Sequence, residues 1–317
     1  MPQTRMYPLH STLGFARLGG TFLRGLGAVL ALTAALAGWA QIVVPNISGT
    51  NVGLYDLSGN AINSSLVSGF SQPFATAAAA NGHFYVLDET AGTVGEYTTA
   101  GLVVNASLIT GLSVPTAIAV ASKGNIYVAN NAGTVGEYTA AGAVVNSTLF
   151  TAPSLPRGMV FDSGGNLYIT SYGTGDVGKY TAAGATLNAS LINIAGGTYG
   201  LAIDGSDNLY VVAPNTRIVG KYSNTGAVIN ASLVNTGGFT PFFAGVDLSG
   251  NVYLSLNGSN VIAEYDSFGA LVNGSFITGL NNPGSFSFIA VPEPSVWALL
   301  LSGTGLLSLV GVIRRRR

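Results

Sequence analysis

The chain has 317 residues, of which 8% are charged and 44 are glycine, and its formal net charge at pH 7 is −1. It contains no cysteine, which excludes a disulfide framework, thiolate catalysis and cysteine-based zinc sites. Residues 41–290 hold twelve acidic and five basic residues, and this excess of acid argues against a nucleic-acid-binding surface, which needs clustered Lys and Arg.

The first 40 residues have the parts of a secretory signal peptide. Three arginines and no acidic residue precede the apolar run "LGAVLALTAALAGWA" at 26–40. A basic segment, a short apolar run and small residues at a cleavage site define such a signal. We therefore predict a signal peptide over 1–40, with cleavage after Ala40 or Ala37. A retained membrane anchor is the alternative, although the apolar run is short for a span.

The central part repeats one frame six times. Six tyrosines mark it with steps of 42, 41, 42, 42 and 43 residues: Tyr55, Tyr97, Tyr138, Tyr180, Tyr222 and Tyr265. In every copy a glycine follows four residues after the tyrosine and an asparagine four residues after that glycine. Such a period indicates a repeat architecture.

Each unit predicts four short strands. In the third unit they are 115–121, 126–129, 134–138 and 143–149, separated by turn residues. Four strands in this repeat length make one propeller blade, and blades must pack around an axis to bury their faces. We predict an all-β, six-bladed β-propeller over 41–290. A β-solenoid is the alternative, but its turns are usually shorter.

Small residues recur two positions before each tyrosine, and we expect them to allow adjacent sheets to approach closely: Gly53, Gly95, Gly136, Gly178, Gly220 and Ala263. The central part also does not begin and end at the boundary of a repeat unit. Its beginning matches strands two to four of a unit, and 284–290 matches a first strand. We predict that 285–290 pairs with the segment near 42–44 and closes the ring, which removes exposed sheet edges.

The segment 200–226, "GLAIDGSDNLYVVAPNTRIVGKYSNTG", resembles NHL-type repeats, a family of varied functions. Some six-bladed relatives, the gluconolactonase-like enzymes, hold an axial metal with carboxylates and Asn, and streptogramin lyase uses histidine chemistry. Those ligands do not map onto this sequence, and we expect no cofactor. Three aspartates occupy one repeating position: Asp162, Asp204 and Asp247. We expect them to cap turns and not to bind a metal, because an Asp at this position can accept hydrogen bonds from backbone amides of its turn.

Two further features have a structural and a functional interpretation. His83 is the one histidine of 41–290 and stands beside a turn where other units have asparagine. We interpret it as a simple replacement at that turn, because one histidine cannot supply a catalytic triad or a metal cluster. Asn-x-Ser/Thr recurs once in each unit, which matches a glycosylation acceptor. Its fixed position in the fourth strand favours a structural role.

Variable loops are expected at one rim of the ring. In a propeller, the loops after strand two and before strand one share a rim, and a rigid scaffold that carries variable polar loops suits binding. We predict a binding surface there, with simple solvated loops as the alternative. Its candidate residues are Asp88, Glu89, Asn130, Asn131, Arg157, Tyr172 and Arg217.

The C-terminal segment predicts a membrane span. Residues 296–313 contain no charged residue, and eighteen residues of helix reach about 27 Å, close to the thickness of a hydrocarbon core. Four arginines follow, and positive charge stays on the cytoplasmic side, so the central part is expected outside: Arg314, Arg315, Arg316 and Arg317. A buried core helix is the alternative.

The order of motifs in 291–317 resembles the PEP-CTERM sorting signal of Gram-negative bacteria. Pro292, Glu293 and Pro294 match its tripeptide, ahead of the apolar segment and the arginine cluster. The resemblance implies processing by an exosortase, a membrane protease, transient anchoring in the inner membrane, and transfer to the cell surface. It also implies an association with exopolysaccharide.

These observations predict an exported, surface-sorted propeller with a binding or structural role in the extracellular matrix. The expected partners are the exosortase, the inner membrane, and a polysaccharide or another surface protein. A secreted hydrolase or lyase of the gluconolactonase-like or streptogramin-lyase-like type is the alternative.

Overall fold

The computed structural model describes residues 40–79 and 81–290. The predicted signal peptide, except its last residue, the sorting motif, the apolar segment and the arginine tail lie outside these residues. Across the described ranges, no helix reaches the length and apolarity needed to cross a membrane.

Six four-stranded antiparallel sheets form the blades. Blade 1 contains β24 (Ser287–Ala290), β1 (Ala40–Asn46), β2 (Asn51–Tyr55) and β3 (Ala61–Ser68). Blade 2 contains β4 (Pro73–Ala78), β5 (His83–Asp88), β6 (Thr93–Thr98) and β7 (Val103–Ile109). Blade 3 contains β8 (Pro115–Val120), β9 (Ile126–Asn130), β10 (Thr134–Tyr138) and β11 (Val144–Thr151).

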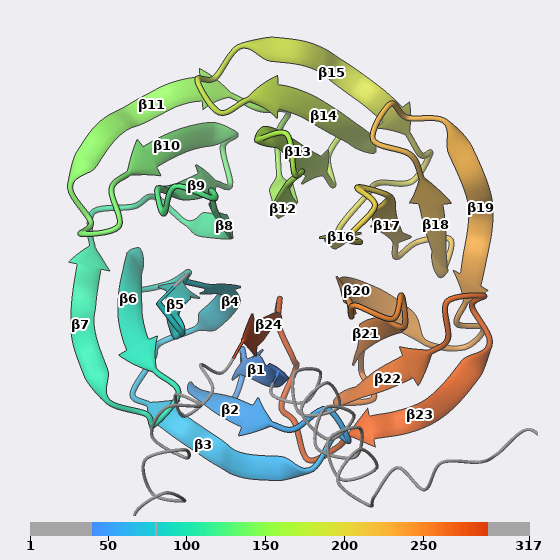
Figure 1. The fold of residues 1–317 in the computed structure, drawn as a ribbon, viewed down its shortest axis with the longest axis horizontal. Helices are drawn as coiled ribbons and strands as arrows, with labels where there is room; N and C mark the ends of the chain where they lie inside the picture. Colours follow the sequence, from blue (N-terminus) through green and yellow to red (C-terminus); the bar gives the residue numbers. More distant parts are fainter. Residues whose placement is uncertain (1–39, 80, 291–317) are drawn as a thin grey trace, which may run out of the picture. The chain divides into compact units, whose positions relative to one another are not determined.

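The other three blades follow the same order. Blade 4 contains β12 (Pro156–Phe161), β13 (Asn166–Ser171), β14 (Asp176–Thr181) and β15 (Thr186–Asn193). Blade 5 contains β16 (Leu201–Ile203), β17 (Leu209–Ala213), β18 (Ile218–Tyr222) and β19 (Val228–Asn235). Blade 6 contains β20 (Thr240–Val246), β21 (Val252–Asn257), β22 (Val261–Tyr265) and β23 (Leu271–Ile277). The six sheets surround one axis, so the predicted six-bladed propeller is confirmed (Figure 1).

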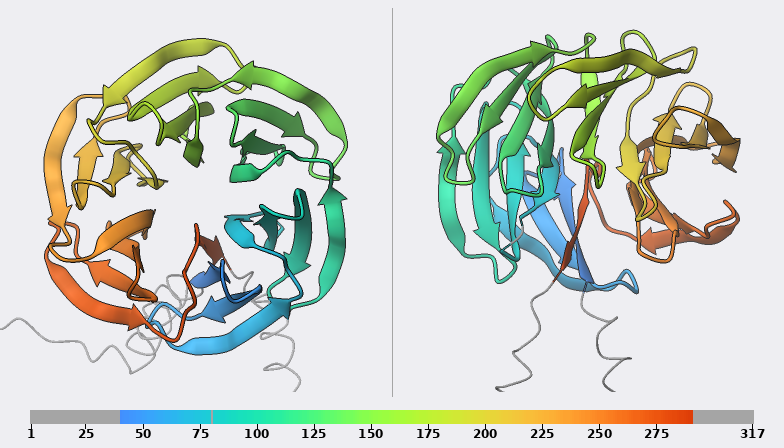
Figure 2. Two further views of the ribbon diagram at one scale, coloured as in Figure 1. Left: turned by 180° about the vertical axis from the view of Figure 1, so that it is seen from behind. Right: turned by 45° about the horizontal axis from the view of Figure 1, so that its top comes forward.

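The ring is closed by strands from the two ends of the described chain. β24 pairs antiparallel with β1, with Ala40 opposite Ala290 and Val43 opposite Ser287, as the repeat phase predicts. The approach to β24 also joins blade 2, because the Ser285 N–H donates to the Phe74 carbonyl at 3.0 Å. The closing strand therefore holds both its own blade and the next one, beside β1 and β4 (Figure 2).

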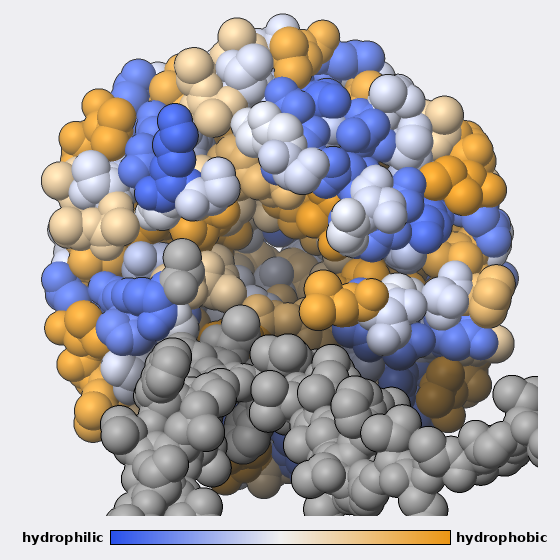
Figure 3. All heavy atoms as spheres, in the orientation of Figure 1, coloured by the Kyte–Doolittle hydropathy of each residue, from blue (hydrophilic) through white to orange (hydrophobic). Residues whose placement is uncertain are grey.

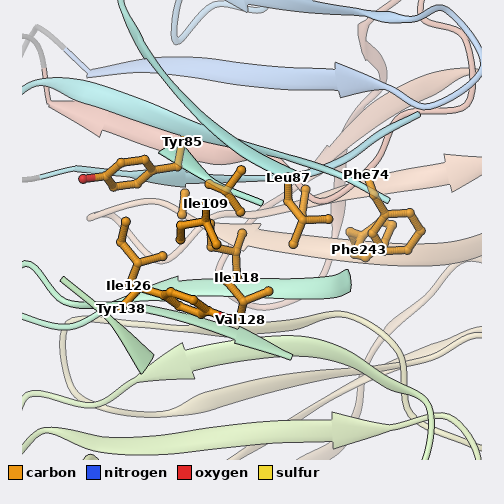
Figure 4. Packing of buried hydrophobic residues seen from close by; sticks show 12 residues of the cluster. Phe74, Tyr85, Leu87, Ile109, Ile118, Ile126, Val128, Tyr138 and Phe243 are labelled. Atoms are coloured by element: carbon orange, nitrogen blue, oxygen red, sulfur yellow. The ribbon is translucent and has the colours of Figure 1, made fainter. Parts of the chain in front are cut away.

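Apolar side chains between neighbouring sheets form the core. Between blades 2 and 3, Leu87 and Ile109 lie in one buried cluster with Ile126 and Val128 (Figure 4). Burial of each such side chain contributes about 1.5–3 kcal/mol. Hydroxyl groups also link inner strands, since the Thr116 hydroxyl donates to the Pro156 carbonyl at 2.7 Å. Each blade thus buries its faces on its neighbours, which explains why the unit must be repeated.

The recurrent glycine before the tyrosine has a different role from the one expected. A Cβ on Gly95 would lie 2.5 Å from the hydroxyl oxygen of Tyr97, and the equivalent glycines of blades 1, 3, 4 and 5 also face the tyrosine of their own strand. The small residue makes room for this ring and not for the adjacent sheet. Blade 6 carries Ala263 at the same position.

The Asn-x-Ser/Thr repeat builds a bulge in each outermost strand. In blade 2, Val94 pairs with Ile109 while Glu96 pairs with Asn105, so four residues of β7 cover two of β6. In all six blades the asparagine side-chain oxygen accepts a hydrogen bond from the N–H two residues later, at 3.0–3.1 Å. These bonds support the structural interpretation, because such bulges shield a sheet edge from pairing with other chains.

The outermost strands contain no charged residue, and several of their aliphatic side chains are exposed, among them Val103 and Val144. On the face shown in Figure 3, hydrophobic residues lie at several places along the outer contour of the ring, with hydrophilic residues between them. The outermost strand of each blade therefore carries a bulge, and several of these strands also expose apolar side chains.

Candidate functional site

The ring has two rims, which the strand directions define. At rim A the innermost strands begin and the second strands of the blades end, as in the pair Pro73 and Asp88. At rim B the opposite ends lie, among them Ala40 and Ala290. The topology places all seven candidate residues at rim A: Asp88, Glu89, Asn130, Asn131, Arg157, Tyr172 and Arg217.

Aromatic side chains meet across the axis near rim A. Phe74 of blade 2 contacts Phe243 of blade 6, with ring centroids 5.5 Å apart. Tyr199, at the start of blade 5, packs on Phe242 at 4.7 Å and on Phe243 at 5.2 Å. Blades 2 and 5 are not neighbours of each other, so these rings converge on the axis. They form an apolar floor below the rim loops.

Arg157 lies on this aromatic floor. Its Cζ atom is 5.9 Å from the centroid of Phe74 and 5.4 Å from that of Tyr199, distances at which a cation is attracted to the ring. The Nε and Nη1 atoms are buried and have no hydrogen-bond partner among the described residues. Guanidinium nitrogens are obligate donors, so the site holds unused donor capacity.

Glu89 and Tyr172 both lie near Tyr199. Burial raises the pKa of Glu89, the Arg157 charge opposes this shift, and the Asp88 charge reinforces it. Burial also raises the pKa of Tyr199; the Arg157 charge lowers it, while those of Glu89 and Tyr172 raise it. The ring of Tyr172 lies edge-on to Tyr199 at 5.6 Å. The structure therefore brings Glu89, Arg157 and Tyr172 together around Tyr199.

Asn130 and Asn131 flank this group in blade 3. The Leu155 N–H donates to the Asn131 carbonyl at 3.1 Å, and the Tyr172 N–H donates to the Leu155 carbonyl at 3.0 Å. The side-chain Oδ1 atoms of Asn130 and Asn131 are buried and lack partners. Five side-chain atoms of the described residues share this state, and four belong to Asn130, Asn131 and Arg157. Native proteins leave few such atoms, so this concentration needs a reason.

Two candidate residues have other roles. Asp88 accepts hydrogen bonds from the N–H groups of Ser71, Gln72 and Ala91 at 2.7–3.0 Å, which makes it a loop cap. Arg217 is exposed and donates through Nη1 to the Gly237 carbonyl at 3.0 Å. Neither contacts the aromatic floor in the described hydrogen bonds and ring contacts, so neither joins the group around Tyr199.

Sequence reasoning missed the aromatic floor itself. Four residues around it occupy one repeating position near rim A: Phe74 and Arg157 follow the prolines that begin β4 and β12, Phe242 follows Pro241 in β20, and Tyr199 follows Thr198 ahead of β16. An alignment of the six units would have placed these four residues in one column.

The remaining polar candidates lie at rim B and act locally. Asp162, Asp204 and Asp247 each accept a hydrogen bond from the N–H of the asparagine four residues later, at 2.7–2.9 Å, so they cap turns as expected. His83 begins β5, and its Nδ1 atom lies 2.7 Å from Glu96 Oε1. Within 40–79 and 81–290, no group of three or more His, Cys, Asp or Glu could hold a metal ion.

Comparison with known proteins shows the fold. No protein-family model and no curated protein matches the chain. A chain of the nidogen/laminin complex matches with a TM-score of 0.65 and 16% identity, over 80% of this chain and 98% of that one. A gluconolactonase from Xanthomonas campestris matches with a TM-score of 0.57 and 15% identity, over 67% and 78%.

A virginiamycin B lyase from Staphylococcus aureus matches with a TM-score of 0.55 and 17% identity, over 72% of this chain and 78% of that one. Binding proteins and enzymes thus share this architecture. At such identities the likeness concerns the fold, and function must come from the site.

Proposed function

We propose that this chain is an exported propeller that binds a ligand at the rim A mouth of its axis. The observation that carries the proposal is the concentration of unpartnered buried polar atoms on Asn130, Asn131 and Arg157, beside an aromatic floor. Apolar surface with a few convergent polar groups is the usual form of a ligand site. Such polar groups cost stability when they stay unpaired, and a bound ligand would pair them.

Binding can be tested by substitution within one rim. Arg157→Gln removes the charge from the mouth, while Arg217→Gln removes a charge from an exposed loop of the same rim. In a screen of ligands by thermal shift, we expect hits that stabilise the original protein and the Arg217 variant but not the Arg157 variant. Hits that stabilise all three equally would contradict the proposal. A metal found by elemental analysis would instead favour the hydrolase or lyase alternative.

We also propose that the C-terminal segment sorts the protein to the cell surface. The support is the order of Pro292-Glu293-Pro294, an uncharged segment and four arginines, together with the N-terminal features. Replacement of the three residues by alanine should leave the uncut protein in the inner membrane, detected by fractionation and mass. Normal size and surface delivery of this variant would contradict the sorting proposal without bearing on the binding site.

A further inference from the structure

We infer that the ligand of the rim A mouth is an acidic sugar, a pyranose ring that carries a carboxylate. This inference rests on the proposed function and specifies its ligand. It follows from three features of the mouth: a cation that forms no ion pair with the described residues, an apolar floor, and acceptor oxygens without donors.

The first feature is the charge of Arg157. The described residues contain three ion pairs, and none of them involves Arg157. The Arg157 charge lowers the pKa of Glu89 while burial raises it, and no ion pair of the described residues joins these two side chains. Buried guanidinium nitrogens such as Nε and Nη1 of Arg157 are costly when they have neither a counter-ion nor a hydrogen-bond partner. A ligand carboxylate supplies this counter-ion, and its geometry matches the planar donors of arginine.

The second feature is the apolar floor. Phe74 and Tyr199 lie against the guanidinium, and Phe242 packs on Tyr199. Tyr172, which is 36% exposed, packs edge-on against Tyr199. Aromatic rings offer large apolar faces at a fixed orientation. The C–H face of a pyranose fits such a surface, whereas a small inorganic anion leaves it uncovered.

The third feature is the pair of asparagine oxygens. The Oδ1 atoms of Asn130 and Asn131 accept no hydrogen bond from the described residues. They need donors, and a carboxylate has none to offer. Sugar hydroxyl groups donate and accept, so a ligand that has both a carboxylate and hydroxyl groups completes the site.

The test compares acidic and neutral sugars on the full chain. The probes are short oligomers of galacturonate, glucuronate and mannuronate, the neutral oligomers of galactose, glucose and mannose, and inorganic phosphate. Affinity is measured by calorimetry at pH 7 and low salt. We expect at least one acidic oligomer to bind tenfold or more tighter than its neutral counterpart. Arg157→Gln should remove this preference, Arg157→Lys should retain part of it, and Arg217→Gln should leave it unchanged.

Each other outcome rejects the inference. Equal binding of neutral and acidic oligomers, with an effect of Arg157→Gln, would leave the proposed function standing and reject the carboxylate. Phosphate binding as tight as the best sugar would reject the sugar. Absence of binding by every acidic oligomer would reject the acidic sugar, while the ligand screen described above would still decide the proposed function. Circular dichroism of each variant checks that the ring is folded.

Discussion

Removal of a buried side chain from β24 should destabilise the whole ring. Ile289 is 1% exposed and belongs to the cluster that includes Val43 and Val86, so it packs blade 1 against blade 2. A buried Ile→Ala substitution costs about 2–5 kcal/mol. A domain of ordinary stability unfolds at about 5–15 kcal/mol, so Ile289→Ala should remove a large share of this free energy.

The same blade offers a matched control. Ile62 on β3 is 51% exposed, and Ile62→Ala should change the free energy of unfolding by no more than about 0.5 kcal/mol. Urea denaturation followed by circular dichroism measures both variants. If Ile289→Ala costs less than about 1 kcal/mol, or no more than the control, β24 is not the strand that closes the ring in solution.

Three further substitutions test local features. Burial raises the pKa of Glu89, so the stability that this side chain contributes is full below the pKa of a free glutamate and is lost as pH rises through the raised pKa. Glu89→Gln should therefore be more stable than the original protein at pH 7, and thermal unfolding at several pH values should show this difference vanish near pH 4. Gly95→Ala would force a Cβ to within 2.5 Å of the Tyr97 hydroxyl and should cost about 1–3 kcal/mol by overpacking, and an unchanged melting temperature would contradict the role assigned to this glycine. Asn146→Ala loses the bond to the Thr148 N–H and should cost about 0.5–1.5 kcal/mol, whereas Val145→Ala on the exposed side should stay within about 0.5 kcal/mol by urea denaturation.

The architecture could be predicted because the sequence repeats its strand pattern. The third unit was expected at 115–121, 126–129, 134–138 and 143–149, and the strands are Pro115–Val120, Ile126–Asn130, Thr134–Tyr138 and Val144–Thr151. Even the closing strand followed from the phase of the repeat. A pattern that recurs six times averages out the local ambiguity of any single strand.

The site was harder to predict because proximity across the axis leaves no local signal. Glu89 and Arg157 come from blades 2 and 4, and only the closed ring brings both to Tyr199. Asp88 shares the rim and the loop of Glu89, yet its carboxylate is consumed by three backbone N–H groups. The sequence identified polar rim residues but not which of them were already satisfied.

The position of the two described ends has a mechanical consequence. Ala40 and Ala290 lie opposite each other at one end of an antiparallel pair, so tension between them would open β1 from β24 one residue pair at a time, like a zipper. In this geometry the bonds break in sequence and do not share the force, as they would if the strands slid past each other. Single-molecule pulling from these two ends should therefore open the ring at low force, whereas pulling across two other blades should meet greater resistance.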